Sequence, residues 1–143
     1  RAIGVCNFRK HHMLALQKTA KFLPMINQVE LHPGMPQLEL LEYCQKMGIA
    51  VEASSPLGIG QVLNNAKILD IAKSKEKSAA QICLRWEVQK GVIVIPRTSN
   101  KKRLKENIDL WGFELSQEEM SILDDIPYCG GLGIDPDTTE DLG

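Results

Sequence analysis

The sequence predicts an α/β protein whose parallel sheet is covered by helices. Two observations support this class. Short apolar runs alternate with helical patterns along the 143 residues, and strand-like runs begin near residues 2, 26 and 50, about one strand–helix–strand repeat apart. Four such units make about half of an eight-stranded barrel, which needs ~250 residues. A four-stranded doubly wound sheet also fits, so the pattern alone leaves both architectures open.

The predicted strands occupy residues 3–6, 25–29, 50–53 and 91–95. The last contains the apolar run from Val92 to Ile95, which is predicted to be buried, and Pro96 closes it. The segments that follow the first three strands carry apolar residues at helical spacing. These residues are Met13, Leu16, Gln17 and Ala20, then Leu40, Tyr43, Cys44 and Met47, then Ile68, Leu69 and Ala72, and finally Ala79, Ile82, Cys83 and Trp86.

Residues at the predicted helix ends fit their positions. Ser78 with Gln81 forms a capping box before the fourth helix, and Ser116 with Glu119 starts a late helix that contains Met120 and Leu123. Gly48 is placed to end the second helix. Beyond Pro127 the chain is rich in Gly and Asp. We therefore expect one unit over residues 1–126 and a tail over 127–143 that is a loop or disordered.

Composition excludes several classes of function. Hydrophobic residues make up 43% and charged residues 24% of the chain, and the net charge is −1. These values are ordinary for a globular protein and argue against nucleic-acid binding, which usually needs a basic domain. No apolar run approaches the ~20 residues that span a bilayer, so no membrane association is expected.

No metal site is predicted. The four cysteines, Cys6, Cys44, Cys83 and Cys129, are too far apart for zinc-ribbon spacing and are interpreted as reduced thiols. His11 and His12 are adjacent, so on a helix they are expected to point in different directions and to make a poor pair of ligands. His32 stands alone.

The most informative segment spans residues 97–107, where the last predicted strand meets a helix. Five cationic side chains lie there, and a helix N-terminus with free N–H groups attracts anions. Arginine can grip phosphate oxygens with two hydrogen bonds, so a phosphate group is one natural partner. A solvated positive helix face is the equally weighted alternative. The five residues are Arg97, Lys101, Lys102, Arg103 and Lys105.

The chain begins with Arg1 and enters a strand-like run at once, without an initiator Met. This start predicts a piece of a longer protein that is cut just before a core element. A signal peptide upstream would be invisible, so the cytoplasm is the default location.

Several separated strings resemble the aldo-keto reductase family. Their order and spacing match strands five to eight of that family's (β/α)8 barrel, and the resemblance extends to about Ile126. The strings are residues 3–8 (IGVCNF), 27–33 (NQVELHP), 55–58 (SPLG) and 95–98 (IPRT), followed by Arg103, Glu106 and Asn107. The resemblance therefore implies the C-terminal half of a (β/α)8 TIM barrel.

The resemblance also implies an NADPH site. Asn7 and Gln28 match positions that hold the nicotinamide carboxamide. The remaining matches are Ser55 and Leu57 beside the pyrophosphate, Arg97 and Thr98 at the 2′-phosphate, Arg103 over the adenine and its phosphate, and Glu106 and Asn107 at the adenine edge. Ser54 stands where the family has an aromatic ring stacked on the nicotinamide, and Cys6 replaces a serine of the family. Both departures are expected to weaken the binding of the nicotinamide.

The family's catalytic Asp, Tyr, Lys and His lie on the first four strands, which have no counterpart in this chain. Tyr43 and Tyr128 do not match the catalytic tyrosine, and His32 matches a loop histidine with a structural turn role. The resemblance thus implies the C-terminal portion of an NADPH-dependent oxidoreductase that reduces aldehydes and ketones to alcohols. This chain alone is expected to be inactive, because a carbonyl substrate needs the missing half.

A non-catalytic nucleotide-binding or regulatory half-barrel module is the alternative function. In either case, exposed barrel edges predict self-association.

Overall fold

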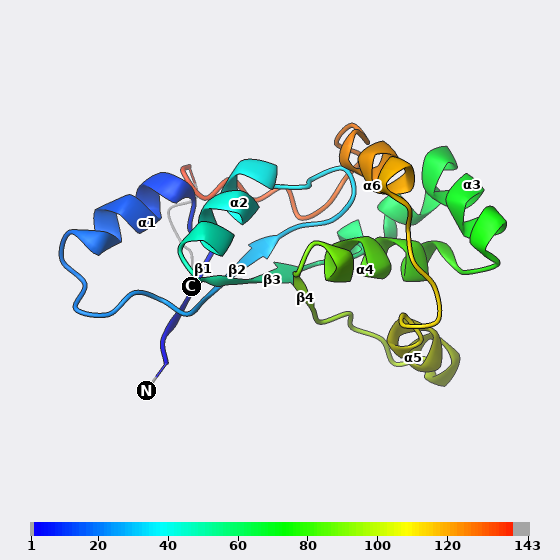
Figure 1. Ribbon diagram of the computed structural model, residues 1–143, viewed down its shortest axis with the longest axis horizontal. Helices are drawn as coiled ribbons and strands as arrows, with labels where there is room; N and C mark the ends of the chain where they lie inside the picture. The colour runs from blue at the N-terminus through cyan, green and yellow to red at the C-terminus, as the bar shows by residue number, and fades with distance from the viewer. Residues whose placement is uncertain (1, 139–143) are drawn as a thin grey trace.

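The computed structural model describes residues 2–138 and contains one four-stranded parallel sheet (Figure 1). Its strands are β1 (Gly4–Cys6), β2 (Ile26–Glu30), β3 (Ala50–Ser54) and β4 (Ile93–Val94), and they lie side by side in the order β1-β2-β3-β4. A doubly wound sheet reverses its strand order at a switch point, whereas barrel strands follow one another around the wall. The consecutive order therefore decides in favour of a barrel wall.

Within residues 2–138, six α-helices and two short 3₁₀ helices connect or follow the strands. Figure 1 places α1 and α2 near one end of the molecule and α3 and α6 near the other. The helices are α1 (Lys10–Gln17), α2 (Leu38–Lys46), α3 (Ala66–Lys75), α4 (Ala79–Gln89), α5 (Lys101–Ile108) and α6 (Gln117–Asp124), with η1 (Gly58–Gly60) and η2 (Val62–Asn64) between β3 and α3.

The core lies between the sheet and its helices. Alternate strand residues such as Val29, Val51 and Ala53 are buried, because every second side chain of a strand points to the same face of the sheet. They belong to the same cluster as Cys44 of α2 and Trp86 of α4. The Trp86 Nε1–H donates to Asp124 Oδ1 at 2.8 Å, which ties α4 to α6.

The predicted helix ends are confirmed. Ser78 with Gln81 and Ser116 with Glu119 form reciprocal capping boxes at the starts of α4 and α6. Gly48 has a φ of 69° just beyond α2, a left-handed conformation that favours glycine. The first helix is shorter than its pattern predicted, since α1 ends at Gln17.

The prediction of a buried last strand is only half right. β4 comprises Ile93 and Val94; Val92 is buried at 4% exposed, whereas Ile93 and Ile95 are 44% and 49% exposed. Successive side chains of a strand point to opposite faces of the sheet, so the two isoleucines share the face opposite to that of Val92. Ile93 is in register with Glu52, which also lies outside the buried core.

Residues 127–138 contain no helix or strand, but hydrogen bonds hold them to the sheet. The Leu132 N–H donates to Glu30 Oε1 at 2.6 Å, and Arg9 Nη2 donates to Asp135 Oδ1 at 2.7 Å. Gly131 has a φ of 153°, and a Cβ there would lie 2.2 Å from Glu30 Oε1, so this close approach requires glycine. The division at residue 126 stays a prediction, and its last residues, 139–143, lie outside the described residues.

Within residues 2–138, none of the helices has the length and apolar character needed to cross a lipid bilayer.

Candidate functional site

Three adjoining hollows lie where the chain leaves β3 and β4. Their volumes are about 560, 320 and 450 Å³, and Arg97 and Arg103 line all three. The carboxyl ends of parallel strands are where barrel proteins build their sites. The first hollow continues along Ser55 and Leu57, which follow β3, and the third continues along Glu106 and Asn107 of α5.

The middle hollow is the most polar in composition and sits at the strand-to-helix junction. Its lining is Arg97, Thr98, Ser99, Asn100 and Arg103. Within residues 2–138 neither guanidinium has a carboxylate partner, and the cluster's one ion pair is a 3.8 Å contact between Lys102 Nζ and Glu106. Two unpaired guanidinium groups around one hollow favour an anionic ligand over a neutral one.

The expected free N–H groups at the start of α5 are partly engaged. Asn100 caps the helix, and its Oδ1 accepts from the Lys102 N–H at 2.8 Å and from the Arg103 N–H at 3.3 Å. An asparagine before a helix commonly satisfies these donors. The attraction for an anion at this junction therefore comes mainly from the arginine side chains rather than from the helix N-terminus.

Seven of the ten predicted cofactor-binding residues line these hollows, two others lie at strand ends, and Gln28 lies in the middle of β2. Asn7 follows β1 with a φ of 57°, and its N–H donates to the Gln28 carbonyl at 2.8 Å. Ser54 ends β3, where it pairs with Glu30 of β2. The remaining residue is Gln28, whose register partners are Cys6 in β1 and Glu52 in β3.

Neighbouring side chains already engage the Gln28 amide. Its Nε2 donates to Glu52 Oε1, and the Cys6 thiol lies 3.9 Å from its Oε1. Sequence reasoning missed Glu52. The signal was available, because Glu52 is two residues before Ser54 and side chains two apart in a strand share a face.

Two more residues of the hollows were not predicted from the sequence. Asn100 is an asparagine directly before a helical run, which is a recognisable capping signal. Leu132 lines the first hollow from the tail, and no local pattern predicts a contact over such a sequence distance.

His32 has the structural role that its resemblance implied. It is wholly buried, its Nδ1 lies 2.9 Å from the Pro33 carbonyl, and its backbone forms a bridge with Met35. Its Nε2 lies 3.4 Å from Glu30 Oε1. These contacts hold the turn after β2 in place. Gly58 and Gly131 approach the His32 ring closely.

Buried acidic and thiol groups lie outside the hollows. Burial raises the pKa of Glu87 in α4 well above its usual range. Burial, with a contribution from the charge of Glu87, does the same to the pKa of the Cys83 thiol. All four cysteines are free, as predicted, and the thiols of Cys44, Cys83 and Cys129 have pKa values raised by burial, so they are poor nucleophiles.

The prediction that His11 and His12 diverge is wrong. Their Nε2 atoms lie 3.1 Å apart and their ring centroids 4.0 Å apart. Both rings turn toward Asp137, whose Oδ1 lies 2.9 Å from His11 Nε2 and 3.3 Å from His12 Nε2. Adjacent side chains in the first turn of a helix can converge when a partner lies beside the helix end, and here the tail supplies that partner.

A run of parallel strands in consecutive order with a cationic hollow at their carboxyl ends is the arrangement of part of a (β/α)8 barrel. The chain belongs to the aldo/keto reductase family, because the family model matches residues 1–127. It is 46% identical over 140 residues to the 9,11-endoperoxide prostaglandin H2 reductase of Trypanosoma cruzi, covering 96% of this chain and 50% of that protein. It is 47% identical over 137 residues to the glyoxal reductase of Bacillus subtilis, covering 96% and 50%.

Solved structures agree with this assignment. A mutant of Gox0644 in complex with NADPH matches 98% of this chain and 52% of its own, with a TM-score of 0.91 at 38% identity. A Bombyx mori aldo-keto reductase in complex with NADP matches 95% and 47%, with a TM-score of 0.84 at 35% identity. The chain spans about half the length of the curated relatives it matches, which confirms the predicted half-barrel fold.

Proposed function

We propose that this chain is the cofactor-binding half of an NADPH-dependent reductase that converts aldehydes and ketones to alcohols. The observation that carries the proposal is the pair of unpartnered guanidinium groups, Arg97 and Arg103, around one hollow at the carboxyl end of β4. Relatives with the same fold are described in complex with NADPH or NADP, which supports the choice of ligand.

The hollow suits the adenosine end of the cofactor. Arg97 and the Thr98 hydroxyl would hold the 2′-phosphate, and Arg103 would both pair with that phosphate and stack on the adenine. Glu106 and Asn107 would contact the adenine edge from the third hollow. This division gives a preference for NADPH over NADH, because only NADPH carries the 2′-phosphate.

The rest of the cofactor would run along the ends of the strands toward β1. Ser55 and Leu57 would lie beside the pyrophosphate, and Asn7, Gln28 and Ser54 would meet the nicotinamide. The Gln28 Nε2 donates one hydrogen to Glu52 and its Oε1 accepts from the Cys6 thiol, so its second N–H and its second lone pair would serve the carboxamide. Ser54 offers a hydroxyl in place of a ring face, so we expect a loosely held nicotinamide.

NADPH, when bound, supplies a hydride to the carbonyl carbon of a substrate. The residues of this chain bind and orient the cofactor, whereas the proton for the carbonyl oxygen comes from outside it. Tyr43 accepts from Gln17 Nε2 at 2.8 Å on the helical side of the fold, and neither Tyr43 nor Tyr128 lines the hollows. The chain alone is therefore expected to bind NADPH without reducing carbonyls.

Titration of the purified chain with NADPH and NADH, followed by calorimetry, tests this proposal. Arg103→Ala should weaken NADPH binding about tenfold or more, because a charge-assisted bond contributes about 1.5–3 kcal/mol. Lys105→Ala is the matched control, since it removes a positive charge from the same helix without lining a hollow. Equal affinity for the two cofactors, or equal losses in the two variants, would refute the proposal.

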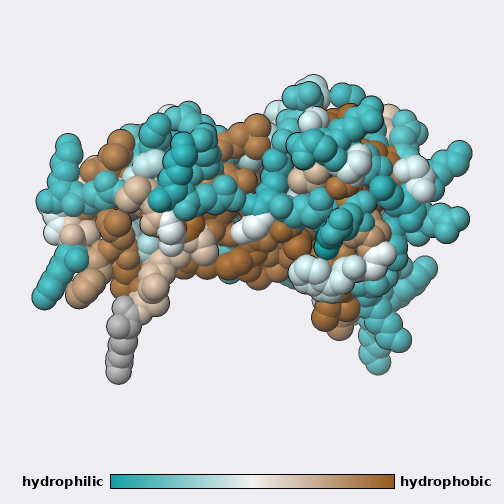
Figure 2. Space-filling view, viewed as in Figure 1, coloured by the Kyte–Doolittle hydropathy of each residue, from teal (hydrophilic) through white to brown (hydrophobic). Residues whose placement is uncertain are grey.

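A second candidate function is a non-catalytic module that associates with another copy through its open edges. Ile3, Ile93 and Ile95 are exposed beside the outer strands β1 and β4, and Figure 2 shows apolar surface along the sheet. Unpaired strand edges with apolar neighbours invite pairing. Sedimentation of the chain tests the association: a dimer or larger species supports it, and a monomer refutes it.

A further inference from the structure

The start of α1 and the tail bring three metal-binding side chains together. His11 Nε2, His12 Nε2 and Asp137 Oδ1 form a triangle with sides of 3.1, 2.9 and 3.3 Å. Each residue offers one ligand atom, and all of these atoms lie within 4.8 Å of one another. Imidazole nitrogen and carboxylate oxygen are common ligands of zinc in proteins.

The size of the triangle fits a tetrahedral ion. The three ligand atoms are separated from one another by 2.9, 3.1 and 3.3 Å. The point in their plane that is equidistant from all three lies roughly 1.8 Å from each atom. An ion displaced by about 1 Å from that plane would lie about 2.05 Å from all three, which is the usual zinc distance to nitrogen and oxygen ligands. The ligand atoms therefore need little movement, and water could complete the fourth position.

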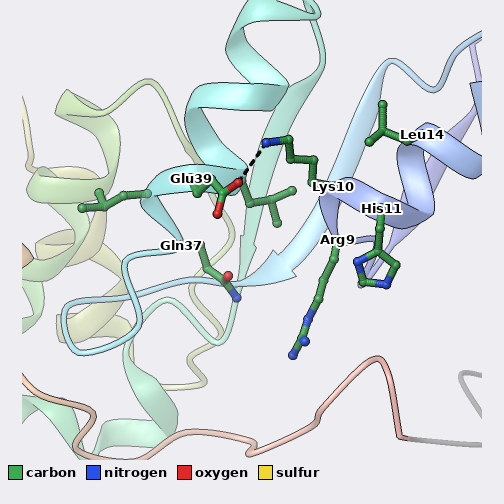
Figure 3. Close-up of a pocket in the computed structure, with 8 residues that line it drawn as sticks. Arg9, Lys10, His11, Leu14, Gln37 and Glu39 are labelled. Atoms are coloured by element: carbon green, nitrogen blue, oxygen red, sulfur yellow. Dashed lines mark hydrogen bonds and ion pairs between the residues drawn. The ribbon is translucent and has the colours of Figure 1, made fainter.

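The surroundings of Asp137 suit a ligand. Arg9 Nη1 donates to Asp137 Oδ2, which leaves Oδ1 facing the two histidines. A hydrogen bond to the second oxygen of a coordinating carboxylate is a common support for metal sites. Beside the cluster, a hollow of about 470 Å³ lined by Arg9 and His11 opens between α1 and α2 and gives an ion access from solvent (Figure 3).

One hydrogen bond opposes the ion. The Arg9 backbone N–H donates to His12 Nδ1 at 3.1 Å, so neutral His12 carries its proton on Nε2. Coordination needs the Nε2 lone pair, and the proton must therefore move to Nδ1 and the bond to Arg9 must break. Metal binding therefore breaks one neutral hydrogen bond at the start of α1 and forms three coordinate bonds. His11 has no such restriction, because no hydrogen bond to its Nδ1 is present in the described part of the chain.

We propose that His11, His12 and Asp137 form a site for a divalent cation of the zinc type, which fastens the tail to α1. The site is separate from the proposed cofactor hollows, since none of its three residues lines them. Metal binding can therefore be measured without NADPH, and the failure of either proposal leaves the other standing.

The test is a titration of the purified protein with Co²⁺, followed by displacement with Zn²⁺. Tetrahedral Co²⁺ should give intense visible d–d absorption that Zn²⁺ abolishes. His11→Asn and Asp137→Asn should each weaken binding by about tenfold to 100-fold or more, since even supporting residues of a metal site have effects of that size. Glu39→Gln is the matched control, because it removes an exposed carboxylate charge that lines the neighbouring hollow and lies outside the triangle.

Three results would overturn the proposal. They are the absence of d–d absorption, equal losses in the Glu39→Gln and Asp137→Asn variants, and a thiolate-to-cobalt band that disappears in Cys6→Ser, which would place the ion on the exposed cysteine. X-ray absorption of the Zn²⁺-bound protein gives a check that needs no variant. Imidazole nitrogens and oxygen in the first shell support the site, and a sulfur shell refutes it.

Discussion

The buried acid Glu87 offers a sharp test of the energetics of this fold. Its side chain is wholly buried in α4, and neither carboxylate oxygen has a hydrogen-bond partner among the described residues. Burial raises its pKa well above the ordinary value of 4.5, because a charge without a partner is costly in the core. The folded protein therefore keeps Glu87 protonated at a pH where the unfolded chain has already released the proton.

The sign of the pH dependence follows from that difference. Above pH 4.5 the folded state binds more protons than the unfolded state, so the free energy of unfolding falls as pH rises toward the folded pKa. The slope is about 1.4 kcal/mol per pH unit while the carboxyl stays protonated in the folded state. Glu87→Gln should remove this slope, and Glu87→Met should also remove an unsatisfied buried group, which stabilises by about 1–3 kcal/mol at neutral pH.

Urea denaturation followed by circular dichroism between about pH 5 and pH 8 measures both effects. Glu76→Gln is the matched control, because Glu76 is exposed at the end of α3 and its substitution should leave the slope unchanged. Parallel stability curves for the wild type and Glu87→Gln would refute the reasoning. Such curves would mean that Glu87 ionises with an unshifted pKa or finds a partner in solution.

The remaining predictions concern one contact each. Trp86→Phe should destabilise the protein by about 1–2 kcal/mol in urea titrations, because it removes the 2.8 Å hydrogen bond to Asp124 that joins α4 and α6. Ser116→Ala should cost about 1 kcal/mol in the same assay through loss of the α6 cap, whereas Ser121→Ala on the same helix should cost less. Gly131→Ala should displace the tail, since its Cβ would lie 2.2 Å from Glu30 Oε1. Limited proteolysis should then cut residues 127–138 faster than in the wild type, and an unchanged cleavage rate would contradict the role given to this glycine.

Features that depend on near neighbours in the chain were predictable from the sequence. The capping box of Ser78 and Gln81 involves residues three positions apart, and the barrel assignment rests on strings that occur in a fixed order. The hollow at Arg97 and Arg103 was also predicted, because a strand, a turn and a helix start are contiguous there. Local sequence carries enough information for such elements.

Features that depend on distant contacts were not predictable. The convergence of His11 and His12 needs Asp137, which lies more than a hundred residues away. Leu132 likewise reaches the hollow at Arg103 from the tail. These contacts leave no pattern in the residues nearby, so helix and strand patterns alone could not reveal them. The link between Gln28 and Glu52 is an intermediate case, because the period of two places Glu52 on the face of Ser54, whereas the strand register that sets it beside Gln28 is not a local feature.

The fastening of Arg9 to Asp135 closes a loop of 126 residues. Closing such a loop in an unfolded chain costs about 4 kcal/mol in chain entropy. An exposed ion pair stabilises the folded state by only about 1 kcal/mol or less. In the folded protein the sheet already holds these two ends near each other, so the contact depends on the sheet. No residue from 127 to 138 is buried, so the segment should open locally, and its amides should exchange with solvent before those of β2 and β3. Because Leu132 belongs to that segment, each opening would uncover one wall of the hollow at Arg103 while the strands beneath stay intact.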